Sequence, residues 1–336
     1  MTSRNSNWNK LNTPFLLRPV GKDYLWGGNR LNDDFSKGID KSPLAETWEC
    51  STHPSGISVV SSGEYAGKML NEVLRENPGM MGRHANEKGE LPILIKLIDA
   101  GKDLSIQVHP DDKYAAVHEN GALGKTEMWY VLDAAPGAEI IYGFQKDTSK
   151  EEVMKALKDG KLEALLRRVP IAKNQVFYVS PGTIHGISHG ALLAEVQESS
   201  DITYRLYDYE RIDKNGKKRP LHIEKALEVM NYKSTESPKQ PIRVLKYTRG
   251  CATEILNRCK YFQTERVLIN TERIREYMEF SELAETFQVL LCTDGCGVMH
   301  AGDTVLDIFK GDCIFVPAGD EVIRLHGMAQ FLKVRC

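Results

Sequence analysis

Short apolar runs, separated by clusters of Gly, Pro, Asp and Asn, make up most of the chain. Many of these runs are rich in β-branched and aromatic residues, which is typical of strands. They lie at 91–100, 125–134, 173–187 and 191–209, and the last is long enough for two strands. Many short strands with evenly spaced turns indicate a sandwich or a closed barrel. The pattern therefore predicts a mainly β protein with a few inserted helices.

Helical spacing is confined to a few segments. Residues 148–169 place apolar side chains on one stripe and two glutamates in the first turn, and 63–77 and 221–232 are further helix candidates. We therefore predict a helical insert near 147–172. Its apolar stripe consists of Val153, Leu157, Leu162, Leu165 and Leu166.

A polar, proline-bearing stretch at 233–242, KSTESPKQPI, divides the pattern in two. We interpret it as a linker between domains at 1–235 and 240–336. NQVFYVSPGTIHGI and DCIFVPAGDEVIRL share one order: a polar start, an aromatic-apolar strand, Pro and Gly, then a second strand. They indicate a duplicated β unit. The first copy has a histidine after the Pro-Gly turn, whereas the second copy has Val322 at roughly the matching place. We therefore expect the C-terminal domain to lack metal ligands.

Charge and cysteine content exclude several classes of protein. The 336 residues carry a net charge of −2, too little to recruit nucleic acid or an anionic membrane, so an anionic ligand needs locally placed Arg and Lys. No apolar run approaches the ~20 residues of a membrane span. The seven cysteines form no CxxC pair, and residues 1–14 have no apolar signal core. We expect a cytoplasmic protein.

The stretch LSIQVHPDDKYA, at 104–115, places two polar side chains on one face of a strand. Gln107 and His109 are two positions apart and so point the same way. Glu127 and His185 follow in later strand-like runs. Two imidazoles and a carboxylate suit Zn²⁺ or another first-row divalent ion, and a Gln carbonyl can fill a weaker fourth place. A single buried histidine is more often a hydrogen-bonded core residue, but the four together favour a metal site.

The arrangement resembles the cupin pattern. Gly101 is followed after five residues by Gln107-x-His109, and Pro181-Gly182 precedes His185. It departs from most cupins in having Gln for the first His and an insert of about one helix before Glu127. The resemblance implies double-stranded β-helix (jelly-roll) barrels in tandem, a bicupin.

A more specific resemblance is to the short bacterial form of type I mannose-6-phosphate isomerases. It covers residues from about 14 to 235, extends weakly to the C-terminus, and implies a cytoplasmic, zinc-dependent aldose–ketose isomerase acting on mannose 6-phosphate and fructose 6-phosphate. In that family the metal ligands correspond to Gln107, His109, Glu127 and His185, with one Zn²⁺ per chain. The resemblance rests on LSIQVHPDD, GKTEMWYVL, PGTIHGI, SSDITYRLYDYER, YLWGGNRL and AETWECSTHPSG.

Aldose–ketose isomerisation moves a proton between C1 and C2 through an enediol(ate), so the site needs a base and a group that stabilises an oxyanion. Glu195 is the leading candidate for the base, and the alternative is an exposed carboxylate paired with a lysine. Arg205 stands among apolar neighbours on a strand, so it is either an edge residue or an anion clamp. The family resemblance favours the clamp or a catalytic role at the sugar-phosphate site.

Three further residues are predicted to bind substrate. Lys96 is a cation within an apolar run, and Ser105 precedes the metal-binding motif. Arg211 matches a family position usually occupied by Lys. The other basic residues of 211–220 are typical of a solvated loop tip. Trp26 and Glu46 also match family motifs, and either could form part of the pocket wall or have a structural role. The insert at 147–172 stands where larger family members carry a helical domain, and it could act as a lid or a cap.

Other functions remain open from the sequence. An iron-dependent cupin dioxygenase or oxidase could use the same two histidines and carboxylate. Lys96 and Arg205 discriminate, because a sugar phosphate requires cations and an apolar substrate does not. A sugar- or metal-binding regulator lacks support, since there is no DNA-binding helix pair or basic stripe. An isomerase of another phosphosugar, the metal bound in the cell and the oligomeric state are not decided by the sequence.

Overall fold

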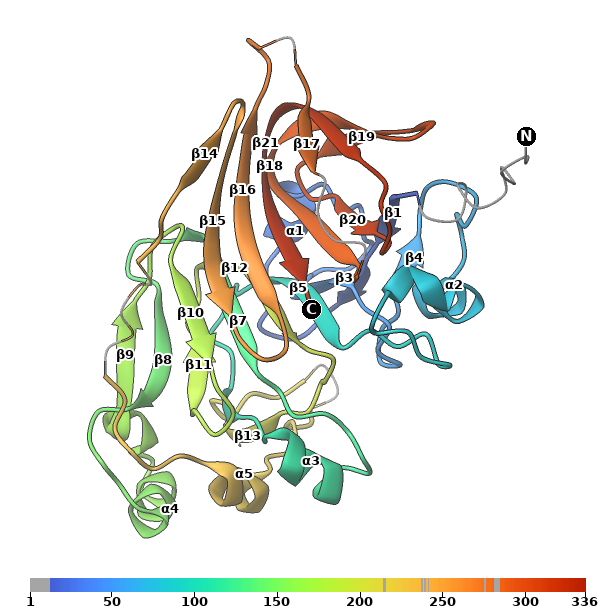
Figure 1. Cartoon of the computed structure of the whole chain (residues 1–336). Helices are drawn as coiled ribbons and strands as arrows, with labels where there is room; N and C mark the ends of the chain where they lie inside the picture. Colours follow the sequence, from blue (N-terminus) through green and yellow to red (C-terminus); the bar gives the residue numbers. More distant parts are fainter. Residues whose placement is uncertain are drawn as a thin grey trace, which may run out of the picture.

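The computed structural model describes residues 13–336, except 214, 215, 237, 239, 241, 275 and 281–284. Antiparallel strands in three sheets dominate the described part (Figure 1), which confirms the predicted mainly β class. Five α-helices are present among the described residues: α1 Arg30–Asp33, α2 Leu70–Glu76, α3 Asp112–His118, α4 Lys150–Lys158 and α5 Ile223–Val229, with 3₁₀ turns at Pro78–Met81 and Leu162–Leu165.

A six-stranded sheet lies at the centre of the molecule. Its long strands β5 and β12 are buried along their whole length, because other layers cover both faces of the sheet. This explains why these segments are near-continuous apolar runs rather than alternating ones. The strand order is β10 (Val176–Val179), β7 (Glu127–Ala134), β12 (Ala191–Glu198), β5 (Ile93–Asp99), β3 (Glu46–Cys50), β2 (Val20–Lys22).

A five-stranded sheet covers one face of the six-stranded sheet, which we call the front face, and the two sheets together form a barrel. Trp129 and Leu193 of one sheet pack with Ile140 and Ile187 of the other. The outer face of the five-stranded sheet packs against α4 and α5. Its strand order is β13 (Tyr204–Tyr207), β6 (Ile106–Val108), β11 (His185–Ile187), β8 (Glu139–Phe144), β9 (Leu166–Pro170).

A ten-stranded sheet covers the rear face of the six-stranded sheet and curls around a core of its own. It includes β1 and β4 from the N-terminal part of the chain, since β1 pairs with β20 and with β4. The division into domains at 235–240 therefore stays a prediction. The path runs β14 (Lys246–Thr248), β15 (Cys251–Arg258), β16 (Gln263–Asn270), β21 (Ile323–Arg335), β18 (Gln288–Ala301), β20 (Cys313–Val316), β1 (Phe15–Arg18), β4 (Val59–Val60), with β17 (Met278–Phe280) beside β21 and β19 (Thr304–Phe309) beside β18.

The helix predicted across 148–169 is shorter than expected. It begins at a capping box in which Ser149 accepts from the Glu152 N–H, and it ends at Lys158. Gly160, with φ of 65°, terminates it in the left-handed region. Leu166 then begins strand β9. Val153, Leu162 and Leu166 of the apolar stripe are nevertheless buried, because a 3₁₀ turn and a strand also direct side chains into the core outside the five-stranded sheet. Leu157 and Leu165 are partly buried against the same core.

A buried ion pair ties the segment after α1 to the central and ten-stranded sheets. Lys37 Nζ lies 2.7 Å from Glu49 Oε2, and it also donates to the carbonyl of Gly311. The two side chains are 4% and 0% exposed. Burial raises the pKa of Glu49 even though Lys37 opposes this.

Replacing Lys37 leaves the Glu49 carboxylate without its cation. We expect Lys37→Met to lower the free energy of unfolding by about 3–5 kcal/mol, the usual cost of breaking a buried pair. Because the pKa of Glu49 is already raised, the loss should grow as pH rises above the ordinary carboxylate pKa. Denaturant unfolding at two pH values measures this. The double variant Lys37→Met/Glu49→Gln should recover part of the loss, and an equally unstable double variant would contradict the explanation.

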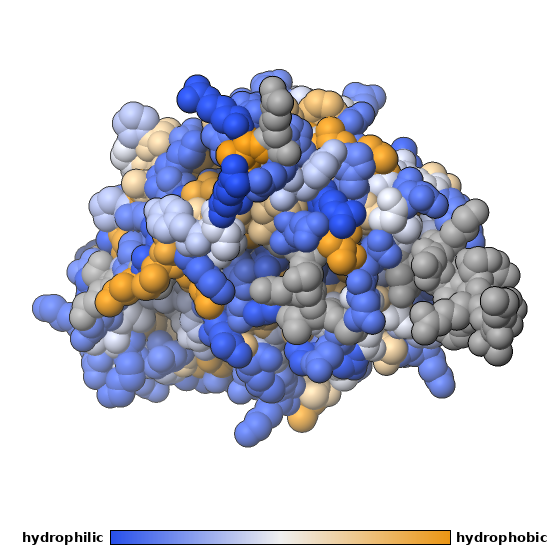
Figure 2. All heavy atoms as spheres, turned by 45° about the horizontal axis from the view of Figure 1, so that its top comes forward, coloured by the Kyte–Doolittle hydropathy of each residue, from blue (hydrophilic) through white to orange (hydrophobic). Residues whose placement is uncertain are grey.

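No helix in the described part of the chain is long and apolar enough to cross a membrane. Figure 2 shows hydrophilic side chains over most of one face, with hydrophobic ones in separate groups. All seven cysteines are free thiols, as the absence of CxxC pairs predicts. The cytoplasmic location stays a prediction, and the predicted lack of a signal core falls mainly on residues 1–12, outside the described residues.

Candidate active site

Four predicted metal ligands meet at one end of the barrel. Gln107 lies on β6, His109 directly follows β6, Glu127 begins β7 and His185 begins β11. Gln107 and His185 are opposite each other in an antiparallel pair. Glu127 comes from the facing six-stranded sheet. The four side chains, which are far apart in the sequence, therefore lie close together because their strands meet at this end of the two sheets.

The distances between the ligand atoms suit a small metal ion. His109 Nε2 lies 3.2 Å from Glu127 Oε1, and His185 Nε2 lies 3.7 Å from Glu127 Oε2. A tetrahedral ion with bonds of ~2.1 Å spaces its ligands by ~3.4 Å. All three residues are at most 1% exposed. They form the one such metal-ligating group found among the described residues.

Hydrogen bonds orient the ligands toward one another. His109 Nδ1 contacts the carbonyl of Ile202 and His185 Nδ1 contacts that of Thr183, each at 2.8 Å. An Nδ1–H that donates to a carbonyl leaves Nε2 free to bind a metal. Both carboxylate oxygens of Glu127 are buried; Oε1 faces the Lys125 ammonium at 2.8 Å, and Oε2 has no hydrogen-bond partner within the described structure. Buried acceptors are normally satisfied, so Oε2 in particular is suited to a cation.

The protonation states also fit metal binding. Burial, with a contribution from Lys125, lowers the pKa of His109 to about 3, and burial lowers that of His185. Burial alone would raise the pKa of Glu127, but Lys125 and His109 outweigh it and hold that pKa well below its usual range. Neutral imidazoles and an ionised carboxylate are the forms that ligate metals.

Gln107 can complete the set. Its Oε1 accepts from Ser105 Oγ at 3.2 Å, and its Nε2 lies 3.4 Å from His185 Nε2. A rotation of the carboxamide exchanges the two atoms, and the Ser105 hydroxyl can serve as donor or acceptor to either. The carbonyl oxygen of Gln107 is therefore available as the weaker fourth ligand.

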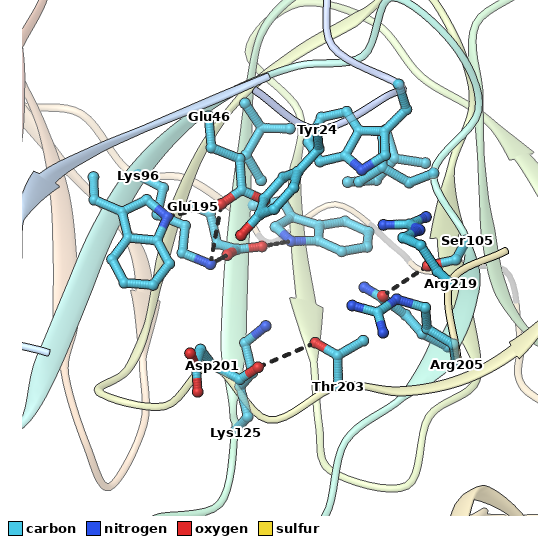
Figure 3. Close-up of a pocket in the computed structure, with 17 residues that line it drawn as sticks. Tyr24, Glu46, Lys96, Ser105, Lys125, Glu195, Asp201, Thr203, Arg205 and Arg219 are labelled. Carbon is cyan, nitrogen blue, oxygen red and sulfur yellow. Dashed lines mark hydrogen bonds and ion pairs between the residues drawn. The ribbon is translucent and has the colours of Figure 1, made fainter. Parts of the chain in front are cut away.

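A cavity of about 190 Å³ opens beside these ligands. Figure 3 shows its two chemically different ends: Glu46, Lys96 and Glu195 meet at one, and Ser105, Arg205 and Arg219 lie at the other. The remaining lining residues are Tyr24, Trp26, Trp48, Ile98, Leu104, Gln107, Lys125, Trp129, Ile187, Asp201 and Thr203. The predicted site residues Lys96, Ser105, Glu195 and Arg205 are thus brought together, as are Trp26 and Glu46.

The first end is a buried cluster of two carboxylates around one ammonium. Lys96 Nζ lies 3.3 Å from Glu195 Oε1 and 3.7 Å from Glu46 Oε2. Trp129 Nε1 donates to Glu195 Oε2 at 2.7 Å, and Trp48 Nε1 donates to Glu46 Oε2 at 2.8 Å. Lys96 is opposite Glu195 in the β5–β12 pair, so the sheet register creates the contact.

The charges of this cluster perturb one another. Burial alone would lower the pKa of Lys96, but Glu46 and Glu195 outweigh it and raise that pKa. Burial, followed by the charge of Glu127, raises the pKa of Glu195. Glu195 is 4% exposed, which excludes the alternative of an exposed strand carboxylate. A buried carboxylate with a raised pKa suits proton transfer near neutral pH.

The second end carries two guanidinium groups. Arg205 projects from β13 on the face opposite Tyr204 and Leu206, and its Nε has no hydrogen-bond partner within the described structure. Burial and then the neighbouring Arg219 lower its pKa. Arg219 Nε donates to Asp208 Oδ2 at 2.8 Å. Two cations held together in a half-buried position favour an anionic ligand between them.

Arg211 does not line this pocket. It pairs with Asp208 and donates to the carbonyl of Asp103, so it holds the loop rather than facing the cavity. Arg219 takes the position that we expected for Arg211. The prediction of a solvated loop tip at 211–220 is therefore wrong for Arg219, whose side chain is 20% exposed. No local pattern in KKRP distinguishes it from an ordinary loop residue.

The sequence reasoning also missed Lys125. Its side chain is 5% exposed, and its Nζ lies 2.8 Å from Glu127 Oε1 and 3.5 Å from His109 Nε2. Lys125 lines the cavity on the side next to the metal ligands. The signal that identified Lys96 was a lysine within an apolar run; Lys125 only precedes the apolar run in KTEMWYVL, which is a weaker form of the same signal.

The barrel and its site define the class of protein: a cupin-type fold with a single His–Glu–His centre, within the described residues, next to a pocket with cations placed for a small anion. A family model for the catalytic domain of type I phosphomannose isomerase matches residues 15–159. Over 317 residues the chain is 37% identical to the Bacillus subtilis protein named mannose-6-phosphate isomerase ManA, covering 94% of this chain and 97% of that one. The chain belongs to the type I phosphomannose isomerases.

Other relatives agree with this placement. A mannose-6-phosphate isomerase of Streptococcus mutans is 44% identical over 217 residues, which cover 65% of this chain and 67% of that protein. A crystal structure of the mannose 6-phosphate isomerase from Bacillus subtilis superposes with a TM-score of 0.87 at 35% identity, covering 96% of this chain and 99% of that one. The predicted family and cupin-type fold are confirmed.

Proposed function

We propose that this chain interconverts mannose 6-phosphate and fructose 6-phosphate, with one Zn²⁺ held by His109, Glu127, His185 and Gln107. The observation that supports it most is the pocket itself, where a buried carboxylate and an arginine pair line one sugar-sized cavity beside a metal-ligating group. The named activity of relatives that match nearly the whole chain supports the choice of substrate. Two imidazoles, a carboxylate and a carbonyl suit zinc.

Each pocket residue has a separate role in the proposed reaction. Arg205 and Arg219 bind the phosphate group, which orients the sugar toward the opposite end of the cavity. The Glu195 carboxylate removes the proton from C2 of the aldose and returns it to C1, while the hydroxyl proton moves from O2 to O1, so atoms and charges balance. Lys96 fixes Glu195 and favours its ionised form. Bound zinc supplies a Lewis acid that stabilises the developing oxyanion.

An iron-dependent oxygenase using the same ligands is the alternative. The pocket lining argues against it, because Lys96, Lys125, Arg205 and Arg219 all face a cavity that an apolar or catecholic substrate would have to fill. An isomerase of a different phosphosugar would use the same machinery. Its substrate would differ only in the hydroxyl groups that the rest of the lining contacts.

The direct test is isomerisation of mannose 6-phosphate by the purified protein before and after chelation. We expect chelation to remove essentially all activity and Zn²⁺ to restore it, with Fe²⁺ and Mg²⁺ as comparison ions. Protein that contains zinc but fails with mannose 6-phosphate, and acts on another aldose phosphate, would replace the proposed substrate. Activity that depends on Fe²⁺ and consumes O₂ would replace the reaction.

Asp208 should position Arg219 without touching substrate. We expect Asp208→Asn to raise the KM for the sugar phosphate about tenfold and leave kcat within about twofold, since its charge-assisted contacts with Arg219 and Arg211 are weakened but not removed. Steady-state kinetics measure the split, with Asp213→Asn in the same loop as the matched control. A fall in kcat with unchanged KM would contradict a role in binding the phosphate.

A further inference from the structure

Arg205 lies on β13, the strand at one edge of the five-stranded sheet. On its inner side Arg205 is opposite Gln107 of β6, and the register shifts between Arg205 and Tyr207. The main-chain N–H and C=O of Arg205 are both bound by one residue outside the sheet. Main-chain groups on a free edge are otherwise left to water. The residue that binds them therefore decides how firmly the main chain of Arg205 is held.

That residue is His222, which stands where a neighbouring strand would lie. Its main-chain N–H donates to the Arg205 carbonyl at 2.8 Å, and its Nδ1 accepts from the Arg205 N–H at 3.3 Å. A side-chain nitrogen thus replaces the carbonyl acceptor that a further strand would supply. His222 is also the N-cap residue of α5, yet its side chain makes no capping hydrogen bond. N-cap side chains commonly accept such a bond, so here the acceptor serves Arg205 instead of the helix.

The protonation state of His222 fits an acceptor. Burial, and after it the positive charges of Arg205 and Lys225, lower the pKa of His222. Glu119 opposes this shift, but it also contacts Lys225 Nζ at 2.6 Å and accepts from the Tyr204 hydroxyl at 2.7 Å. The imidazole is therefore neutral at neutral pH. A neutral ring that carries its proton on Nε2 accepts at Nδ1.

The segment 219–222 links the two arginines of the pocket. Arg219 is three residues before His222, and the connection includes Pro220, whose ring fixes one main-chain angle. One end of this segment presents the Arg219 guanidinium to the cavity, and the other end holds β13 at Arg205. Figure 3 shows both guanidinium groups at the same end of the cavity. Like charges at this spacing repel, so the chain itself must hold them together.

We infer that His222 is a positioning residue for the phosphate-binding arginines: it holds the main chain of Arg205 at the edge of β13 and so sets the spacing between Arg205 and Arg219. This inference rests on the proposed function, in which these two side chains bind the phosphate group. His222 does not line the cavity, so it acts through Arg205. Without its acceptor, the Arg205 N–H loses its partner and the two guanidinium groups move apart.

Substitutions that remove or keep the acceptor test this role. His222→Leu removes it, whereas His222→Asn places an amide oxygen near the position of Nδ1. We expect His222→Leu to raise the KM for mannose 6-phosphate about tenfold and to leave kcat within about threefold, since a contact that only positions the phosphate site is lost. His222→Asn should stay within about threefold of the parent chain. The matched control is His118→Leu, at an exposed histidine of α3 away from the cavity, which should change neither constant.

Sulfate, a dianion without a sugar, separates this inference from the proposed reaction. Calorimetry should show that Arg205→Ala removes sulfate binding, that His222→Leu weakens it about tenfold and that His222→Asn preserves it. A chain that follows this pattern but does not isomerise mannose 6-phosphate would support the role of His222 and overturn the proposed substrate. Sulfate binding that Arg205→Ala leaves unchanged would overturn the inference, because the arginines would then not bind the anion.

The role of His222 is also overturned by three kinetic results. An unchanged KM in His222→Leu would show that Arg205 is held without the imidazole. An equal rise of KM in His222→Asn would show that the acceptor is not the relevant property. A fall in kcat with unchanged KM would place the effect outside the phosphate site.

Hydrogen exchange of the Arg205 amide, followed by NMR, tests the contact without activity. Exchange should be slow in the parent chain and in His222→Asn, and faster in His222→Leu. Equal exchange in all three would overturn the inference. If His222→Leu fails to fold, His222→Gln replaces it, because its amide lies one bond further from the main chain than that of asparagine.

Discussion

Glu127→Gln is expected to lower kcat by about 10³-fold, because a bound Lewis acid supplies several kcal/mol of transition-state stabilisation. The substitution keeps the shape of the side chain and removes its charge. Both Glu127 oxygens are buried and face the two histidines, so an amide there would place an N–H donor against a metal ligand. Kinetics at saturating substrate, together with zinc content by mass spectrometry, measure the effect.

A matched control is available on the neighbouring strand. Glu198 is also buried, at 2% exposure, but it accepts from the Thr126 N–H and does not line the pocket. Glu198→Gln keeps an acceptor for that N–H and should retain both zinc and activity. If Glu127→Gln retained a full complement of zinc and normal kcat, the assignment of the metal ligands would be wrong.

Glu195→Gln is expected to lower kcat by about 10²–10⁴-fold, the usual contribution of a positioned general base. KM should change little, because the amide still accepts from Trp129 Nε1. Glu46→Gln is the matched control, since Glu46 contacts the same ammonium of Lys96 from the other side. Equal losses from both variants would assign the effect to the Lys96 cluster rather than to proton transfer by Glu195.

The pH dependence of the reaction gives a second readout. Burial and the charge of Glu127 raise the pKa of Glu195, so the active, ionised base is lost as pH falls through a value above the ordinary carboxylate pKa. The acid limb of kcat in the parent chain should therefore lie at that raised value. Because a raised pKa opposes ionisation in the fold, stability falls as pH rises through the same window. Glu195→Gln should remove both effects.

Much of this site could be predicted because its residues violate the local pattern. Lys96 and Glu195 stand out as charges within apolar strands, and Gln107 with His109 shares one face of a strand. Such side chains need partners, so they indicate chemistry even before their partners are known. Family motifs then supplied the reaction.

Residues in polar surroundings could not be recognised in the same way. Arg219 lies in a loop that is already basic, so its sequence context does not mark it as a binding residue. Its contact with Asp208 orients it at the pocket. Arg211 was misplaced for the same reason, because sequence spacing cannot tell which of two arginines bound to one carboxylate faces inward. The shared sheet of β1 and β20 was also beyond prediction, since these strands lie near opposite ends of the chain, at 15–18 and 313–316, and no local signal specifies their pairing.

The pairing of β5 with β12 also has a consequence for how the chain folds. Seven consecutive pairs set Glu195 opposite Lys96. A slip of one position would turn Glu195 to the rear of the sheet, among the apolar side chains that pack against the ten-stranded layer. An unpaired buried charge costs several kcal/mol, so misaligned strands are strongly disfavoured. The Lys96–Glu195 pair thus also favours the correct register of β5 and β12. A chain that loses both charges should form misaligned strands and aggregate more often during refolding.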